Sequence, residues 1–159
     1  MGMQNERTPD MSTEKLIFKA TEPYECNMGA VAEAPYIIKK DGIYYMTYSG
    51  SNFLSPFYCV AYATSENPLE GFVKYKNNPI LVGDGKTISG IGHHCITYSA
   101  DKKRMFIVYH AHDDALEYHT RHLSISEIYF YNKFNAICGC WFAVESNVAE
   151  DCCNIWYLI

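Results

Sequence analysis

Short runs of alternating apolar and polar residues, many of them built around tyrosine, dominate this chain of 159 residues. One run covers 34–40 and the next covers 43–51, and between them lies Asp41-Gly42, a dipeptide that favours tight hairpin turns. The 3.6-residue spacing of apolar side chains that marks amphipathic helices is weak throughout. The pattern therefore predicts an all-β chain. Two more strands, over 58–65 and 72–76, are expected to follow the hairpin and complete a four-strand unit.

The same pattern restarts after a linker. Residues 77–92 are rich in Gly, Asn and Pro, and three further strands are predicted after them, over 93–99, 104–112 and 121–130. The second unit begins at His93 and the first begins at Glu33, 60 residues earlier. Repeated antiparallel four-strand units of this size are typical of the blades of a β-propeller.

A propeller arrangement gives these two polar residues a common location. The first strand of each blade lines the central channel, so side chains at the starts of these strands converge on its axis. Glu33 and His93 are therefore predicted to be partners in one site. A propeller closes with about four blades or more, whereas this sequence holds one complete unit, most of a second, and a leader over 13–27. We interpret the leader as the last strand of a further blade and the chain as part of a larger propeller.

Charge and composition limit the classes of partner. Apolar residues make up 48% and charged residues 19%, which is a globular composition. The net charge of −5 argues against nucleic acid and anionic membranes, because both select a basic protein face. No apolar run approaches the roughly 20 residues of a membrane-spanning helix, and residues 1–17 lack the apolar core of a signal peptide. We expect no nucleic-acid or membrane partner, and a cytoplasmic location if the N-terminus is genuine.

The chain has seven cysteines, and four of them lie in its last 22 residues. These four occur as Cys138-Gly139-Cys140 and Cys152-Cys153, and neither spacing is that of a zinc site. Adjacent cysteines seldom bridge each other because the geometry is strained. We therefore expect unpaired thiols and a reducing compartment.

Two segments at the ends differ from the rest. Residues 131–159 show no clear strand register, so we divide the chain into a main domain over 1–130 and a cysteine-rich tail. The tail is interpreted either as the product of a frame shift or truncation or as a divergent strand. Residues 1–12 are polar and are predicted to be disordered.

Four stretches of the sequence resemble the C-terminal half of glycoside hydrolase family 43, in the order and spacing of that family. They are VAEAPYIIKKDGIYYMTYSGS, YCVAYATSENPLEGFVKYKNNPIL, SGIGHHCITYSADKKRMFIVYHAH and TRHLSISEIYF. The match covers about residues 13–130. The resemblance implies a five-bladed propeller, of which this chain would form about two to two and a half blades. It also implies a hydrolase of arabinose- and xylose-containing glycans, acting on plant-type polysaccharides or oligosaccharides.

The resemblance implies roles for single residues. Glu33, in a Glu-Ala-Pro motif, matches the general acid that protonates the leaving glycosidic oxygen. His93 matches an active-site histidine at the channel axis, which in some members helps to hold calcium or an ordered water. Arg121 matches an arginine that enters the sugar pocket. Tyr109-His110 matches a position interpreted as packing. No cofactor is required, and calcium near His93 is the one metal that the resemblance allows.

The chemistry agrees with these roles. Inverting glycosidases need a protonated acid and an ionised base about 6.5–9.5 Å apart, with a water between them. Ala32, Ala34 and Pro35 surround Glu33 with apolar groups, which favour the protonated form of a carboxylic acid. We further expect three residues to bind substrate: Tyr48, Ser49 and His94.

The sequence departs from the family in its carboxylates. The general base and an aspartate that tunes the acid both lie in earlier blades of the family, and no segment before Glu33 matches either. We therefore expect this chain alone to lack inverting hydrolase activity. We also expect it to self-associate, because an open propeller leaves unpaired strand edges.

Several alternatives stay open from the sequence. The histidines at 93–94 and at 110 and 112 are either metal ligands or structural residues, and Arg121 either enters the pocket or pairs with Glu117 across a turn. Three functions remain: a glycoside hydrolase seen as a truncated chain, a glycan-binding remnant without catalysis, and a product without a stable function.

Overall fold

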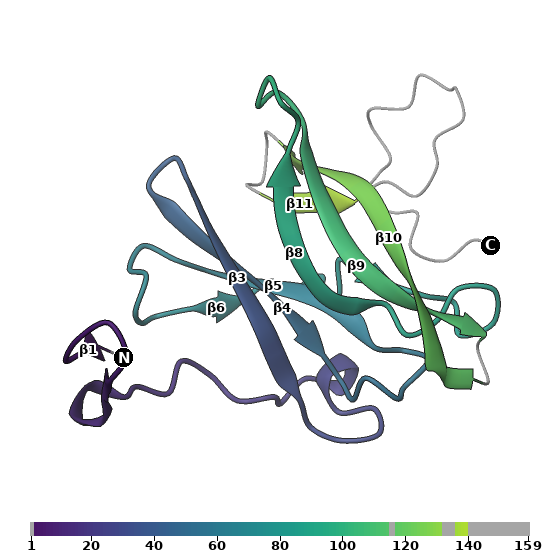
Figure 1. The fold of residues 1–159 in the computed structure, drawn as a ribbon, viewed down its shortest axis with the longest axis horizontal. Helices are drawn as coiled ribbons and strands as arrows, with labels where there is room; N and C mark the ends of the chain where they lie inside the picture. Colours follow the sequence, from purple (N-terminus) through teal and green to yellow (C-terminus); the bar gives the residue numbers. More distant parts are fainter. Residues whose placement is uncertain (1, 115–116, 132–135, 140–159) are drawn as a thin grey trace.

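The computed structural model describes residues 2–114, 117–131 and 136–139. Within these residues the chain is all-β, as predicted, and forms two large antiparallel sheets and one small two-stranded sheet (Figure 1). The described part of the chain contains no helix that is long and apolar enough to cross a membrane.

The first large sheet follows the predicted strands closely. Its strands run in the order β3 (Ala32–Lys40), β4 (Ile43–Gly50), β5 (Cys59–Ser65) and β6 (Val73–Lys74), and β7 (Leu81–Val82) also pairs with β5. The hairpin turn between β3 and β4 has positive φ angles at Asp41 (50°) and Gly42 (85°), as a tight two-residue turn requires. This sheet is the first blade.

The second large sheet is the second blade. Its strands lie in the order β11 (Ala136–Gly139), β10 (Glu117–Tyr131), β9 (Met105–Asp114) and β8 (Gly92–Tyr98). Strand β11 lies beyond the boundary that the sequence suggests at residue 130, and it pairs antiparallel with β10. The segment predicted as a tail therefore contains a strand, and the division of the chain into a main domain and a tail stays a prediction. Residues 140–159 of that tail lie outside the described part of the chain.

Both blades begin with the same irregularity. The register of β3 against β4 shifts between Glu33 and Tyr36, and that of β8 against β9 shifts between Gly92 and Cys95. Each shift contains a non-glycine residue with positive φ, Ala34 (49°) in β3 and His93 (50°) in β8. The position of His93 in the second blade therefore corresponds to that of Ala34 in the first, one residue beyond Glu33. The alignment of Glu33 with His93 made from the sequence is corrected by one residue. A bulge that inserts a residue into a strand cannot be read from periodicity alone.

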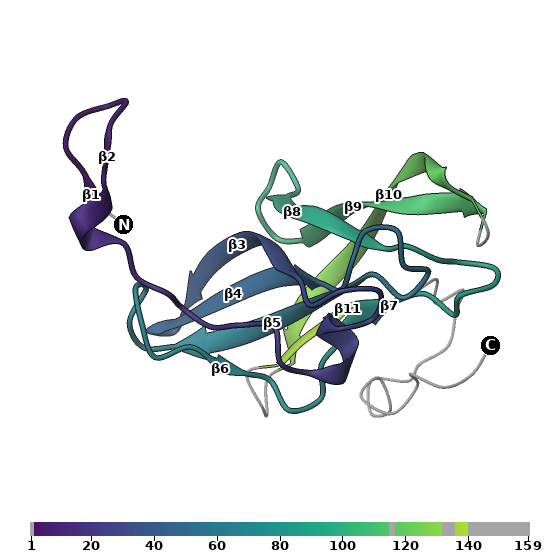
Figure 2. The same ribbon diagram turned by 90° about the horizontal axis from the view of Figure 1, so that it is seen from below.

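The main apolar core lies between the two blades, which pack face to face in Figure 2. Its residues come from both sheets and include Tyr45 and Tyr62 of the first blade and Ile96 and Ile107 of the second, all at most 5% exposed. Burial of these side chains supplies the main favourable free energy that holds the blades together. Many of the tyrosines are therefore packing residues, as the sequence predicts.

The leader crosses the opposite face of the first blade. It contains a short 3-10 helix, η2 (Pro23–Glu25), and no strand is assigned within residues 14–31 of the described chain. The interpretation of residues 13–27 as the last strand of a further blade stays a prediction, because the strands with which it would pair are not among the described residues. An ion pair holds the leader against the first blade: the Glu25 carboxylate is fully buried and lies 2.6 Å from the Lys74 ammonium. A segment held by such a contact need not join a sheet.

The N-terminal residues form their own small element instead of a disordered segment. Strands β1 (Gly2–Met3) and β2 (Pro9–Asp10) pair, and a 3-10 helix, η1 (Met11–Thr13), follows them (Figure 2). The turns are held by side-chain oxygens: Asn5 accepts from the backbone N–H of Thr8 at 3.0 Å, and Asp10 accepts from that of Ser12 at 3.1 Å. These local hydrogen bonds explain why a polar segment is ordered.

Three cysteines are described together with their side chains, and all three are free thiols, as predicted: Cys26, Cys59 and Cys95. Residues 140–159 hold three of the others, and no side chain is described for Cys138.

Candidate active site

The starts of β3 and β8 lie next to each other, and a hydrogen bond joins them. Ser49 of β4 is the register partner of Glu33, and its hydroxyl oxygen accepts the backbone N–H of His93 at 2.8 Å. The first strands of the two blades are in contact. The structure therefore brings Glu33 and His93 to one place, which is where the propeller interpretation expects them.

The Glu33 carboxylate is held by a tyrosine that the sequence did not single out. The hydroxyl of Tyr58 donates to Oε1 of Glu33 at 2.7 Å. Tyr58 directly precedes β5 and is fully buried, whereas Glu33 is only half-buried. Burial raises the pKa of Tyr58 above its ordinary value of 10.0, and the Glu33 carboxylate raises it further against a lowering by Ser49. The hydroxyl therefore stays protonated and remains a donor.

Two glycines make room for the aromatic rings of this cluster. A Cβ atom on Gly92 would lie 2.0 Å from Cε1 of Tyr58, and one on Gly90 would lie 2.1 Å from Nε2 of His112. Any larger residue at either position would displace a ring. The Gly90-Ile91-Gly92-His93 motif thus has a local physical reason beside its resemblance to a family.

A series of nearly parallel rings extends from Tyr58 into the second blade. His110 of β9 stacks on Tyr58 with ring centroids 5.6 Å apart, and the rings of His93 and His112 lie 6.4 and 6.5 Å from that of His110. Burial, together with the positive charge of Arg121, lowers the pKa of His110 to about 4. His110 is therefore neutral near pH 7 and adds no charge beside Glu33.

The two residues of the Tyr109-His110 pair lie on different faces of β9. The sequence predicts a packing position here, and Tyr109 packs in the core, at 2% exposure, whereas His110 packs against Tyr58. Neighbouring residues of a strand point to opposite faces, so the next side chain points away from that core. The alternation along β9 was the signal that could have identified His110.

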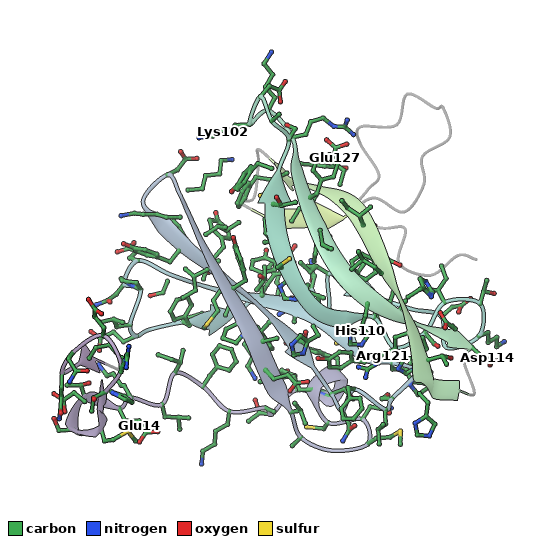
Figure 3. The ribbon with its side chains drawn as sticks, viewed as in Figure 1. Glu14, Lys102, His110, Asp114, Arg121 and Glu127 are labelled. Carbon is green, nitrogen blue, oxygen red and sulfur yellow. The ribbon has the colours of Figure 1, made fainter. Side chains whose placement is uncertain are left out.

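Arg121 of β10 lies beside His110 (Figure 3). Its guanidinium stacks over the ring of Phe53, 5.5 Å from the centroid, and Phe53 is 43% exposed. Within the part of the chain that the structure describes, no carboxylate forms an ion pair with Arg121. Glu117 lies on the same strand, and no side chain is described for it, so its pairing with Arg121 stays an alternative. The structure thus places a guanidinium and an exposed aromatic ring next to the histidines.

The structure places the three predicted substrate-binding residues in three different surroundings. Ser49 belongs to the cluster, although it is fully buried. Tyr48 points to the opposite face of the first blade, is 1% exposed, and donates its hydroxyl to Glu25 at 2.7 Å. His94 is 6% exposed and hydrogen-bonds Thr47 at 2.7 Å between the blades. Neither side chain offers a sugar a free surface, because both are buried.

The ionisation of His94 agrees with this internal position. Burial, with a smaller effect of the nearby His93, lowers the pKa of His94 to about 4. Its ring is therefore neutral near pH 7.

The described residues contain no group of three or more His, Cys, Asp or Glu side chains that could hold a metal ion. Calcium beside His93 stays a prediction. A hollow of about 370 Å³ lies between β9, β10 and the segment around Ile88, and His112 and Asp113 are among its lining residues. Glu33 does not line it, so we place the candidate site by the carboxylate and its partners.

Comparison with known proteins agrees with this arrangement. Residues 2–133 match the family model of the glycosyl hydrolases family 43. An extracellular exo-α-(1→5)-L-arabinofuranosidase of Streptomyces chartreusis is 33% identical over 93 residues, which are 55% of this chain and 28% of the relative.

Two solved structures are similar in both sequence and fold. An endo-1,4-β-xylanase from Bacteroides thetaiotaomicron is 33% identical, with a TM-score of 0.73, over 79% of this chain and 43% of that one. A thermostable family-43 glycoside hydrolase is 32% identical, with a TM-score of 0.71, over 83% and 43%. The chain thus spans less than half the length of each of these relatives.

The family match covers most of the chain, and the two sheets are blades of a partial β-propeller. The chain belongs to family 43 of the glycosyl hydrolases.

Proposed function

We propose that this chain forms the proton-donating part of an inverting glycoside hydrolase that acts on arabinose- or xylose-containing glycans, with Glu33 as the general acid. The observation that carries the proposal is the Glu33 carboxylate, held by Tyr58 at 2.7 Å at the meeting point of two blades of a family-43 chain. The similar arabinofuranosidase and xylanase support the substrate class.

The neighbours of Glu33 suit a sugar. Arg121 supplies N–H donors for sugar hydroxyls, and Phe53 supplies an exposed aromatic ring on which a sugar ring can stack. His93 and the neutral His110 add polar groups that carry no net negative charge. An inverting reaction also needs a base about 6.5–9.5 Å from the acid. We propose that this base comes from a blade that these 159 residues do not include.

The experiment measures binding and turnover separately. Arabino- and xylo-oligosaccharides are titrated into the purified chain by calorimetry, and release of 4-nitrophenol from the aryl arabinofuranoside and xyloside is followed in parallel. The variants are Glu33→Gln and Arg121→Ala. Arg104→Ala is the matched control, because Arg104 is an exposed arginine of the same blade that pairs with Glu127 at 2.8 Å, away from the histidines.

We expect binding without turnover by the wild type, at least tenfold weaker binding by Arg121→Ala, and no change in Arg104→Ala. A tenfold loss corresponds to about 1.4 kcal/mol, which is within the range of a hydrogen bond to a charged group. Turnover that Glu33→Gln abolishes would confirm the acid and contradict the external base. Absence of both binding and turnover would contradict the proposed function.

The same binding experiment bears on a second function, a glycan-binding module without catalysis. The fully buried donors and the Arg121 guanidinium over Phe53 favour it as strongly as they favour the hydrolase. Recovery of turnover on adding a segment that carries the missing blades favours the hydrolase, whereas binding that persists without any such recovery favours the module.

A further inference from the structure

The hydrogen bonds around Glu33 have a fixed direction. The chain of donors begins at the backbone N–H of His93, which can only donate, and this group donates to the Ser49 hydroxyl oxygen at 2.8 Å. Ser49 and the His93 backbone also lie close enough to the Tyr58 oxygen to lower the pKa of Tyr58. Tyr58 uses its single proton on Oε1 of Glu33, at 2.7 Å. Because a carboxylate can only accept, the Tyr58 hydroxyl is the donor in this contact.

This direction favours one carboxyl oxygen as the site of the proton. The unprotonated oxygen of a carboxylic acid is the stronger acceptor, so the hydrogen bond from Tyr58 favours Oε1 as the acceptor and Oε2 as the protonated oxygen. No other described group hydrogen-bonds Glu33. We infer that Tyr58 is a positioning residue for the proton donor and that the transferable proton of Glu33 resides on Oε2. This inference deepens the proposed function and rests on it.

The step balances as follows. The Oε2–H bond breaks and its proton forms an O–H bond to the leaving glycosidic oxygen, which takes the electron pair of its bond to the anomeric carbon. Water forms the new bond to that carbon and gives its proton to the base carboxylate of the proposed function. Glu33 is left as a carboxylate, and the Tyr58 hydroxyl stabilises the new charge at Oε1.

The surroundings of Tyr58 hold its hydroxyl in place. The ring is fully buried, stacks on His110 with an interplanar angle of 18°, and lies against Gly92, where a Cβ would come within 2.0 Å. These contacts come from both blades, so the position of the donor depends on their packing. The hydrogen bond from Tyr58 to Glu33 therefore depends on how the two blades pack against each other.

Infrared spectroscopy tests the inference without needing turnover. The difference spectrum of the wild type minus Glu33→Gln isolates the carboxylate bands of Glu33. A hydrogen bond to one oxygen only makes the two C–O bonds unequal and widens the separation between the antisymmetric and symmetric stretches. We therefore expect Tyr58→Phe to narrow this separation. Tyr45→Phe is the matched control, because Tyr45 is a buried tyrosine of the same blade, 1% exposed, without a contact to Glu33.

Ser49→Ala provides a second variant in case Tyr58→Phe does not fold. It removes the Ser49 hydroxyl that lowers the pKa of Tyr58 without altering a ring, and we expect a smaller narrowing in the same direction. An unchanged separation in folded Tyr58→Phe, or in Ser49→Ala if that variant alone folds, overturns the inference. Because these spectra need no sugar, narrowed bands without oligosaccharide binding would leave the positioning role intact and contradict the proposed function alone.

Discussion

Replacing Lys74 with Met tests the contact that fastens the leader to the first blade. The Glu25 carboxylate is 0% exposed, and the Lys74 ammonium lies 2.6 Å from its Oε2. The Tyr48 hydroxyl donates to Oε1 at 2.7 Å, and the backbone N–H groups of Thr21 and Glu22 donate to Oε2 at 2.6 and 2.8 Å. Methionine keeps most of the apolar stem of lysine and removes the ammonium, with its charge and its hydrogen bonds to Lys19 and Thr21 of the leader.

The expected magnitude follows from this geometry. Removing one partner of a fully buried ion pair costs about 3–5 kcal/mol, because the other charge is left without compensation. In this protein the Lys74 side chain is 15% exposed, and three hydrogen bonds to the carboxylate remain. We therefore expect Lys74→Met to lower the free energy of unfolding by about 2–3 kcal/mol near neutral pH.

The pH dependence separates this effect from a general loss of packing. Burial raises the pKa of Glu25, but the Lys74 ammonium and the hydrogen bonds lower it overall, below the ordinary value of 4.5. A lowered pKa contributes stability above the unfolded value, and that stability is lost as the pH falls through the folded value. A protonated Glu25 no longer needs Lys74, so the deficit of the variant should shrink below about pH 4.5.

Urea unfolding followed by far-UV circular dichroism, at about pH 7 and about pH 4, measures both quantities. Lys15→Met is the matched control, because Lys15 pairs with Glu70 where both side chains are more than half exposed, and such pairs contribute little. A loss no larger than that of the control, or one that stays the same at acidic pH, would refute the reasoning.

Three further predictions follow from other contacts. Gly92→Ala is expected to lower the free energy of unfolding by about 1–3 kcal/mol and to weaken oligosaccharide binding, because the added Cβ would displace the Tyr58 ring. Wild-type stability in urea unfolding together with wild-type affinity in calorimetry would contradict this. The unfolding free energy of the wild type is expected to fall from pH 6.5 to about pH 4, because unfolding lets His94 take up a proton that burial denies it. In urea titrations, His94→Gln should reduce this fall by about 1–3 kcal/mol. The chain is expected to self-associate through the open face of β10, where Leu123 is 79% and Ile125 is 62% exposed. Replacing both residues with Lys should therefore lower the mass measured by light scattering. A monodisperse wild-type monomer would count against self-association.

Local patterns in the sequence were enough to predict the strands and the repeat. The Asp41-Gly42 turn and the alternation on either side of it need only neighbouring residues, and the structure confirms the hairpin and both blades. The same reasoning placed Glu33 and His93 at the starts of inner strands, because that position follows from the order of strands in a blade.

Tertiary packing decided which side chains complete the candidate site. Tyr48 and Tyr58 are both tyrosines of the first blade. The ring of Tyr48 faces the leader from the regular strand β4, whereas Tyr58, in the loop before β5, holds Glu33. His110 joins the site only because the second blade stacks it against Tyr58 of the first. Periodicity records the alternation within one strand, whereas the distance between two blades is fixed by a core that forms only when the whole chain has folded.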